Sequence, residues 1–267
     1  MSLRYPILLV HGMGFRDDEK VGYWGRIPAM LTEAGCKVFL SGQDANASCQ
    51  TNGAFLVKRI EEILKECSCD KINVIAHSKG GLDIRYAIST LGLKSVASLT
   101  MINTPNLGSK TLDTLLKTPR LIIASGAFFF DLFMRLRGDK HPHSAEVCYS
   151  MTTKAAAKFN EQNPDSADVY YQSYACCMKS PFSDMFMLIP ALVVWAFEGR
   201  NDGLLAPEST VWGDFKGVIE SNSRRGISHA DQVDARRRPF TTKDGPGIKD
   251  ILELYKKIIA DLQAKGF

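Results

Sequence analysis

The chain has 267 residues, enough for one large domain with a sizeable core. Apolar residues make up 45% and charged residues 23%, a composition that excludes disordered and fibrous proteins. The net charge is only +4, and no aromatic residues alternate with the basic residues Arg224, Arg225 and 236–238. We therefore expect a solvated surface there and no nucleic-acid partner.

The cysteines and the apolar stretches bear on the location of the protein. The seven cysteines are an odd, scattered set without paired C-x-x-C spacing, so we expect no zinc site and mostly reduced thiols. Apolar stretches near 121–136 and 182–197 are interrupted and shorter than the roughly 20 residues of a membrane span, so no transmembrane segment is expected. A core strand is expected from residue 5, so no signal peptide is expected in the residues before it, and the sequence leaves a cytoplasmic or a secreted location open.

Short β-rich runs alternate with helical patterns over the first hundred residues. The runs are ILLV at 7–10, KVFL at 37–40, INVIA at 72–76 and SLTMIN at 98–103. FLVKRIEEILKE at 55–66 carries apolar residues at helical spacing, which predicts a crossover helix, and a second helix is predicted directly behind Ser78. This alternation is typical of an α/β protein with a parallel sheet covered by helices.

A long insertion then interrupts the alternation. We interpret the chain as a single domain of residues 1–267 with an apolar cap or lid inserted at 110–190. ALVVWAFEG at 191–199 predicts a further strand of the sheet, because Pro190 is expected to separate this run from a cap helix before it. GIKDILELYKKIIADLQ at 247–263 predicts a closing amphipathic helix.

Ser78 lies between a predicted strand and a predicted helix, in VIAHSKGGLD. This is the context of the nucleophile elbow G-x-S-x-G, a sharp turn that exposes the serine and needs small neighbours. Ala76 stands at the first glycine position, and Gly80 at the second. The alternative is that Ser78 is only the N-cap of the helix. The other parts of an acyl-transfer site decide between the two.

An oxyanion hole is the first such part. LLVHGMGF ends the first predicted strand with a glycine-rich turn, which lets the N–H of Met13 point toward a developing oxyanion. Lys79, directly after the serine, supplies the second N–H. The alternative for this segment is an ordinary tight turn.

A base and a carboxylate complete the set. Of the five histidines, His11 and His77 belong to the two loops above, His141 and His143 lie in the insertion, and His229 remains. His229 also lies late in the chain, where the base of a Ser, Asp, His order belongs. Asp202 in EGRNDGLL is the expected acid, with Asp214 and Asp231 as alternatives. Asp231 is disfavoured because it lies only two residues beyond His229.

These segments resemble, in order, the signature segments of the bacterial triacylglycerol lipases of the Pseudomonas and Proteus type. They are YPILLVHGMGF, YWGRIPAMLTEAGCKVF, INVIAHSKGGLDIRY, INTPNLGS, NDGLL and SHADQVD, covering about residues 5–113 and 195–235. The resemblance implies an α/β-hydrolase fold, with a mostly parallel central sheet, helices on both faces and an inserted helical cap. It also implies Ser78 as nucleophile, Asp202 as acid, His229 as base, and the amides of Met13 and Lys79 as oxyanion hole.

The sequence departs from that family at several positions. Ala76 replaces a glycine, Lys79 stands where histidine or glutamine is usual, and Asn106 stands where histidine is common. A charge on Lys79, beside the nucleophile, could change the substrate preference. The family's disulfide has no counterpart, since no cysteine closely follows NDGLL.

The resemblance further implies a structural calcium ion near the catalytic histidine, held by two aspartates, a glutamine-type side chain and backbone carbonyls. Asp231 matches one aspartate by its place after His229, and Asp184 could be the other. The glutamine position corresponds to Ala235, so one of the six to eight oxygens that calcium prefers is missing. The alternative is that Asp231 caps a loop and Asp184 is solvated.

The expected function is that of a serine carboxylic ester hydrolase, a triacylglycerol lipase whose chemistry requires no cofactor. The insertion contains the segment LIIASGAFFFDLFMRL, which has too many apolar residues to bury on one helix face. We therefore expect a hydrophobic lid that covers Ser78 and opens at a lipid surface. We also expect the protein to be a monomer. A core-padding role for these residues is the alternative to a lid. A short-chain carboxylesterase, a thioesterase or an acyltransferase could use the same triad, and a binding protein with a dead site is a third possibility.

Overall fold

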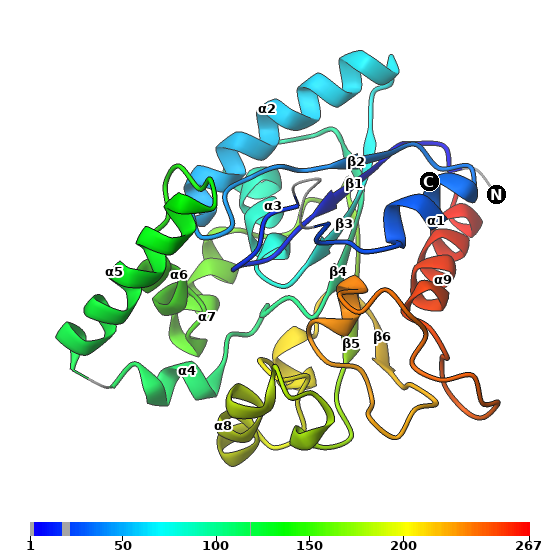
Figure 1. Ribbon diagram of the computed structural model, residues 1–267. Coiled ribbons are helices and arrows are strands. Elements are labelled where there is room, and N and C mark those ends of the chain that lie inside the picture. The colour runs from blue at the N-terminus through cyan, green and yellow to red at the C-terminus, as the bar shows by residue number, and fades with distance from the viewer. Residues whose placement is uncertain (1–2, 18–21, 118) are drawn as a thin grey trace.

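The computed structural model describes residues 3–17, 22–117 and 119–267, without the side chains of 120–122. Within these residues, six parallel strands form one sheet in the order β2-β1-β3-β4-β5-β6 (Figure 1). The strands are β1 (Ile7–Val10), β2 (Val38–Leu40), β3 (Ile72–His77), β4 (Val96–Ile102), β5 (Tyr170–Cys176) and β6 (Asp214–Ile219). The first four confirm the runs predicted from the sequence.

Helices cover both faces of the sheet, because the side chains of each buried strand alternate between two cores. Ile7 and Leu9 of β1 pack with α1 (Ile27–Glu33) and α9 (Ile251–Ala264). Leu8 and Val10 pack with α2 (Cys49–Cys67) and α3 (Gly80–Ser89) on the other face. The α/β-hydrolase fold predicted from the sequence is confirmed by this arrangement.

The remaining helices lie outside these two layers. They are α4 (Lys110–Leu115), α5 (Arg120–Leu136), α6 (Ser144–Ser150), α7 (Thr153–Gln162) and α8 (Leu188–Glu198), with 3-10 turns at Pro181–Ser183, Pro207–Thr210 and Asp231–Val233. In Figure 1, α5 to α7 lie together at the left and α8 lies at the bottom. The predicted insertion 110–190 is therefore not continuous, because β5 of the central sheet divides it into residues 110–162 and the segment around α8.

The prediction of a strand at 191–199 is wrong, because these residues belong to α8. Pro190 is the third residue of α8, inside the first turn, where a missing N–H breaks no helical hydrogen bond. Ala191 and Val194 are buried, whereas Leu192, Trp195 and Phe197 are exposed. A short apolar run has no periodicity that separates a buried strand from a helix with one exposed apolar face.

Sequence reasoning also missed β5 and β6. Polar residues such as Gln172 and Ser173 interrupt the apolar pattern of β5, yet both are fully buried and hydrogen-bonded to Thr100 Oγ1 and Trp212 O. No helix among the described residues is both long and apolar enough to cross a membrane.

Candidate active site

Ser78 occupies the sharp turn that joins β3 to α3. Its φ of +54° is in the left-handed region, which is unusual for a residue with a side chain and is found at functional turns. Residue 79 is the N-cap of α3, and no side chain caps the helix. The N-cap interpretation of Ser78 is therefore wrong. Among the described residues, the Ser78 hydroxyl makes no hydrogen bond, and it lines a cavity.

Two glycines let the backbone segments of the site approach closely. A Cβ on Gly12 would lie 2.7 Å from Ser78 Cβ, so only glycine allows the loop after β1 to reach the serine. A Cβ on Gly80 would lie 2.4 Å from the backbone oxygen of His11. Ala76, by contrast, points its methyl group into the core formed with α2 and α3, which explains how alanine replaces the usual glycine there.

The loop after β1 is fixed on both sides of Met13. The Gly12 N–H donates to Tyr23 Oη at 2.9 Å, and the Gly14 N–H donates to Asn46 Oδ1 at 3.0 Å. Among the described residues, the N–H groups of Met13 and Lys79 donate to no protein acceptor. Both remain available to a bound group, as the oxyanion-hole prediction requires.

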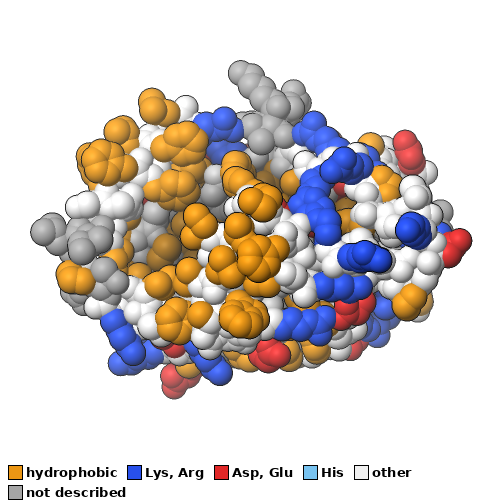
Figure 2. All heavy atoms as spheres, turned by 60° about the horizontal axis from the view of Figure 1, so that its bottom comes forward, with side chains coloured by type: hydrophobic (Ala, Val, Ile, Leu, Met, Phe, Trp, Pro, Cys, Tyr) orange, Lys and Arg blue, Asp and Glu red, His pale blue; other side chains and the backbone are white. Residues whose placement is uncertain are grey.

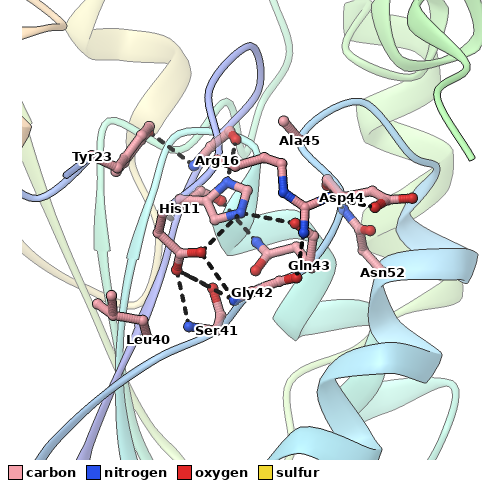
Figure 3. A network of polar contacts seen from close by, with 12 residues as sticks. His11, Arg16, Tyr23, Leu40, Ser41, Gly42, Gln43, Asp44, Ala45 and Asn52 are labelled. Atoms are coloured by element: carbon pink, nitrogen blue, oxygen red, sulfur yellow. Dashed lines mark hydrogen bonds and ion pairs between the residues drawn. The ribbon is translucent and has the colours of Figure 1, made fainter. Parts of the chain in front are cut away.

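A polar network holds this loop against the segment after β2 (Figure 3). His11 Nε2 lies 3.1 Å from the Gln43 carbonyl oxygen, and Gln43 Nε2 donates to the His11 carbonyl oxygen at 3.0 Å. Arg16 adds an ion pair with Asp44 at 3.0 Å. Asp17 accepts from the backbone N–H of Ser41 at 3.0 Å. The network makes His11 a buried structural residue of the loop.

Two departures from the lipase pattern face away from the cavity. Lys79 is buried, and its ammonium group donates to Asp83 Oδ1 at 2.5 Å, so its charge is paired below the nucleophile turn. Asn106 is also buried, accepts from Arg85 and donates to the Thr210 carbonyl oxygen. The suggested effect of the Lys79 charge on substrate preference therefore has no direct contact to support it.

Asp202 and His229 are joined by two short contacts. His229 Nδ1 lies 2.6 Å from Asp202 Oδ2, and the His229 N–H donates to the Asp202 carbonyl oxygen at 2.7 Å. The alternative acids lie elsewhere. Asp214 accepts from Tyr170 and pairs with Lys216, and Asp231 accepts from the backbone of the loop before it.

Four further donors surround the Asp202 carboxylate, which is fully buried. Asn103 Nδ2 donates to Oδ2 at 2.7 Å and Gln232 Nε2 at 2.8 Å. The N–H groups of Leu204 and Leu205 donate to Oδ1 at 2.9 and 2.8 Å. Burial alone would raise the pKa of Asp202, but the adjacent His229 ring and these donors hold it below its usual value. Asp202 is therefore a carboxylate at neutral pH.

A chain of hydrogen bonds connects the Met13 loop with Asp202. Tyr23 Oη, which accepts from Gly12, lies 2.7 Å from His77 Nδ1, and His77 Nε2 lies 2.9 Å from Gln232 Oε1. Gln232 Nε2 in turn donates to Asp202, so Gln232 Oε1 must accept a hydrogen bond from His77. His77 therefore carries its proton on Nε2, and its Nδ1 accepts from the Tyr23 hydroxyl. Sequence reasoning missed Tyr23 and Gln232, although YWGR and SHADQVD contain them, because their adjacency arises only in three dimensions.

Comparisons with known proteins relate the chain to lipases and esterases. Residues 40–127 match the family described as "Putative serine esterase (DUF676)". The chain is 29% identical to triacylglycerol lipase 2 of Saccharomyces cerevisiae, over 97% of this chain and 83% of the yeast protein. It is 28% identical to a triacylglycerol lipase of Vibrio cholerae, over 86% of this chain and 80% of that one.

A solved structure is similar in fold. The crystal structure of a metagenomic carboxyl esterase matches with a TM-score of 0.75 and 16% identity, over 98% of this chain and 76% of that one. The protein is a serine hydrolase. The named relatives and the matched esterase family support ester hydrolysis as its chemistry.

Two cavities of the hydrolase flank His229. The larger, of about 510 Å³, is lined by Ser78, Met13 and His229 together with apolar residues of α4, α5 and α8. The smaller, of about 390 Å³, lies beside Tyr23 and His77 and includes Arg236 and Arg237. Met13, Phe15, Phe186, Met187, Leu204 and His229 line both. The predicted site residues Ser78, Met13 and His229 thus come together at one cavity.

Asp184 and Asp231, the residues suggested for calcium, lie near His229 and are both buried. Asp184 is therefore not solvated. Asp231 accepts from the Ser228 N–H, so the loop-capping interpretation is confirmed. The expectation of a solvated basic run is wrong for Arg236, because its guanidinium forms ion pairs with both aspartates.

His77 gives the hydrolase a pH-dependent stability. Burial and the neighbouring His229, with ring centroids 4.5 Å apart, hold the pKa of His77 well below its usual value. Below about pH 6.5 the unfolded chain gains a proton at this residue that the folded chain does not accept, so stability is lost as the pH falls. Neutral His77 also avoids repelling a protonated His229.

We expect the His77→Gln variant to lose less unfolding free energy than the wild type between about pH 7.5 and pH 5, because the lowered pKa is removed. Urea denaturation at both pH values measures the difference, with His141→Gln at an exposed position as the matched control. A variant that loses as much free energy as the wild type, or more, would contradict the assignment of a neutral His77.

Proposed function

We propose that this serine hydrolase cleaves acylglycerol esters through an acyl-enzyme on Ser78. The observation that carries the proposal is the meeting of Ser78, His229 and Met13 at one cavity, with Asp202 bound to the far side of the His229 ring. The nucleophile, the base and an oxyanion donor can thus reach the same bound ester.

In the first half-reaction, His229 Nε2 accepts the proton of Ser78 as Oγ attacks the ester carbonyl carbon. The N–H groups of Met13 and Lys79 stabilise the oxyanion that forms. Asp202 keeps the other proton of the ring on Nδ1 and stabilises the imidazolium. Nε2 then returns its proton to the leaving alcohol as the carbon–oxygen bond breaks.

In the second half-reaction, water takes the place of the alcohol. His229 accepts a proton from the water as its oxygen attacks the acyl carbon, and a second tetrahedral intermediate forms at the same amides. Its collapse breaks the bond to Ser78 Oγ, which recovers a proton from His229. The products are a carboxylic acid and the free enzyme.

The larger cavity favours a long acyl chain. Its lining includes Leu112, Leu115, Phe130, Val193 and Val194, and charged side chains are absent from the described lining. An apolar pocket of this kind binds hydrocarbon and leaves the ester at its polar end. Within the lipases and esterases, this supports a triacylglycerol lipase, and the proposal of the Pseudomonas and Proteus type rests on the sequence resemblance alone.

We propose further that α5 and α8 form a lid that meets a lipid surface. Their exposed apolar side chains lie beside the cavity, and Figure 2 displays such side chains gathered over this face. For example, the exposed fraction is 69% for Phe129 and 77% for Ile189. An apolar surface of this extent is unusual for a protein that meets only water. These observations favour a lid over a core-padding role.

We expect the wild type to hydrolyse p-nitrophenyl esters with a preference for medium or long acyl chains and the Ser78→Ala variant to lose at least about a thousandfold in kcat. The measurement covers chains from two to sixteen carbons. Equal rates for variant and wild type would exclude Ser78 as nucleophile. A steady decline beyond short chains would instead favour a carboxylesterase, a thioesterase or an acyltransferase with the same triad.

For the lid, we expect faster hydrolysis of an emulsified ester than of the same ester in solution, because a lipid surface stabilises the exposed apolar side chains. Serine variants of Phe129 and Ile189 should lose part of this difference and retain the rate on dissolved ester. Titration of one ester through its solubility limit gives the measurement. Equal rates on both sides of that limit would contradict a lid.

A further inference from the structure

The Arg236 guanidinium and the Ser228 hydroxyl attach the segment that carries His229 to the segment before α8. Arg236 Nη2 donates to Asp184 Oδ2 at 2.7 Å, and Arg236 Nε lies 3.1 Å from Asp231 Oδ1. Ser228 Oγ also donates to Asp184 Oδ2 at 2.7 Å. A single positive group thus bridges two buried carboxylates that the lipase resemblance assigns to calcium.

All four carboxylate oxygens already have protein donors. Asp184 Oδ1 accepts from the Phe186 N–H at 3.0 Å, and Asp231 Oδ2 accepts from the Ser228 N–H at 3.1 Å. The other two oxygens bind Arg236. Arg225 adds a second positive charge 3.9 Å from Asp184. No carboxylate oxygen is therefore left for an ion without displacing a donor.

The donor set does not fit calcium for two further reasons. Calcium prefers six to eight oxygens, whereas Ala235 at the expected glutamine position has no side-chain oxygen. Among the described residues, no three acidic, histidine or cysteine side chains gather as a metal site. An ion beside Arg236 would also meet its positive charge at close range.

We propose that the Arg236 guanidinium replaces the structural calcium ion and that Arg236 is a positioning residue for His229. Its planar donors suit two carboxylates better than an ammonium group would. The bridge connects Asp184, two residues before the cavity-lining Phe186, with the turn that follows His229. The Arg236 side chain thereby helps to hold both His229 and the cavity wall at Phe186 in place.

The opposite side of the same turn is held independently. Asp234 accepts from the Arg26 guanidinium at 2.7 Å, and Tyr255 Oη donates to the Gln232 carbonyl oxygen at 3.0 Å. These contacts join the turn to α1 and α9 of the main domain. Arg236 holds the turn against the cap segment together with the Ser228 hydroxyl, so its removal should move His229 without unfolding the domain.

The experiment compares the wild type with Arg236→Ala, Arg236→Lys and Arg238→Ala. Arg238 is an exposed neighbour in the same basic run and serves as the matched control. Melting temperatures are measured with excess EDTA and with millimolar CaCl2 at about pH 8, where Asp231, whose pKa burial raises to about 6, is ionised. The kcat and KM values on a dissolved short ester are measured well below each melting temperature.

We expect the wild-type melting temperature and kcat to be the same in EDTA and in CaCl2. Arg236→Ala should lower the melting temperature by roughly 4 to 8 °C. It should also lower kcat roughly tenfold or more with KM little changed, because a displaced base slows both half-reactions. Arg236→Lys should recover part of kcat, and Arg238→Ala should match the wild type.

Three results would overturn the proposal. A wild-type enzyme that loses stability in EDTA and regains it with CaCl2 would need the metal. An Arg236→Ala variant that matches Arg238→Ala would show that the bridge holds nothing. A variant that melts earlier but retains its kcat would make Arg236 structural only. The role of Arg236 in positioning His229 rests on the proposed function, whereas its role in place of calcium is tested by the melting temperatures alone. If the Ser78 mechanism fails, the melting temperatures still test whether Arg236 replaces calcium.

Discussion

A buried carboxylate needs donors, and the requirements of Asp202 organise the site. Asn103 follows β4, Leu204 and Leu205 follow α8, and His229 and Gln232 lie on the turn before α9, yet all donate to this one fully buried side chain. Leaving such a charge unpaired would cost several kcal/mol, so the segments that supply donors are held in place with it. The same constraint fixes the plane and the tautomer of His229, which the proposed chemistry needs.

The charges around this carboxylate are arranged so that the base can become positive. His77 stays neutral although its ring packs on His229, because burial and that ring lower its pKa. Lys79 is paired with Asp83 below the nucleophile turn, and Arg236 is paired with Asp184 and Asp231. The positive charges of Lys79 and Arg236 are thus balanced by carboxylates other than Asp202. Asp202 remains the partner of an imidazolium, which favours the charge distribution of the transition state.

The sequence predicts those parts of the molecule that depend on local pattern. The strands of the first hundred residues, the elbow at Ser78 and the loop at Met13 follow from periodicity and small residues at fixed spacing. The α8 helix could not be predicted, because the apolar face that it exposes beside the cavity makes its sequence look like a buried strand. Strand β5 was missed because its buried polar residues are satisfied only by partners distant in the chain. The contacts of Gln232 and Arg236 arise in the same way, from adjacency that no spacing reveals.

We propose that Ser78 is the nucleophile activated by His229 and Asp202. Labelling with a fluorophosphonate, followed by peptide mapping, distinguishes this serine from all others, because the reagent phosphonylates only an activated serine. We expect one label per chain on the peptide that contains Ser78, with much slower labelling of Asp202→Asn. A label on another residue, or ester hydrolysis that continues in a protein without any label, would contradict it.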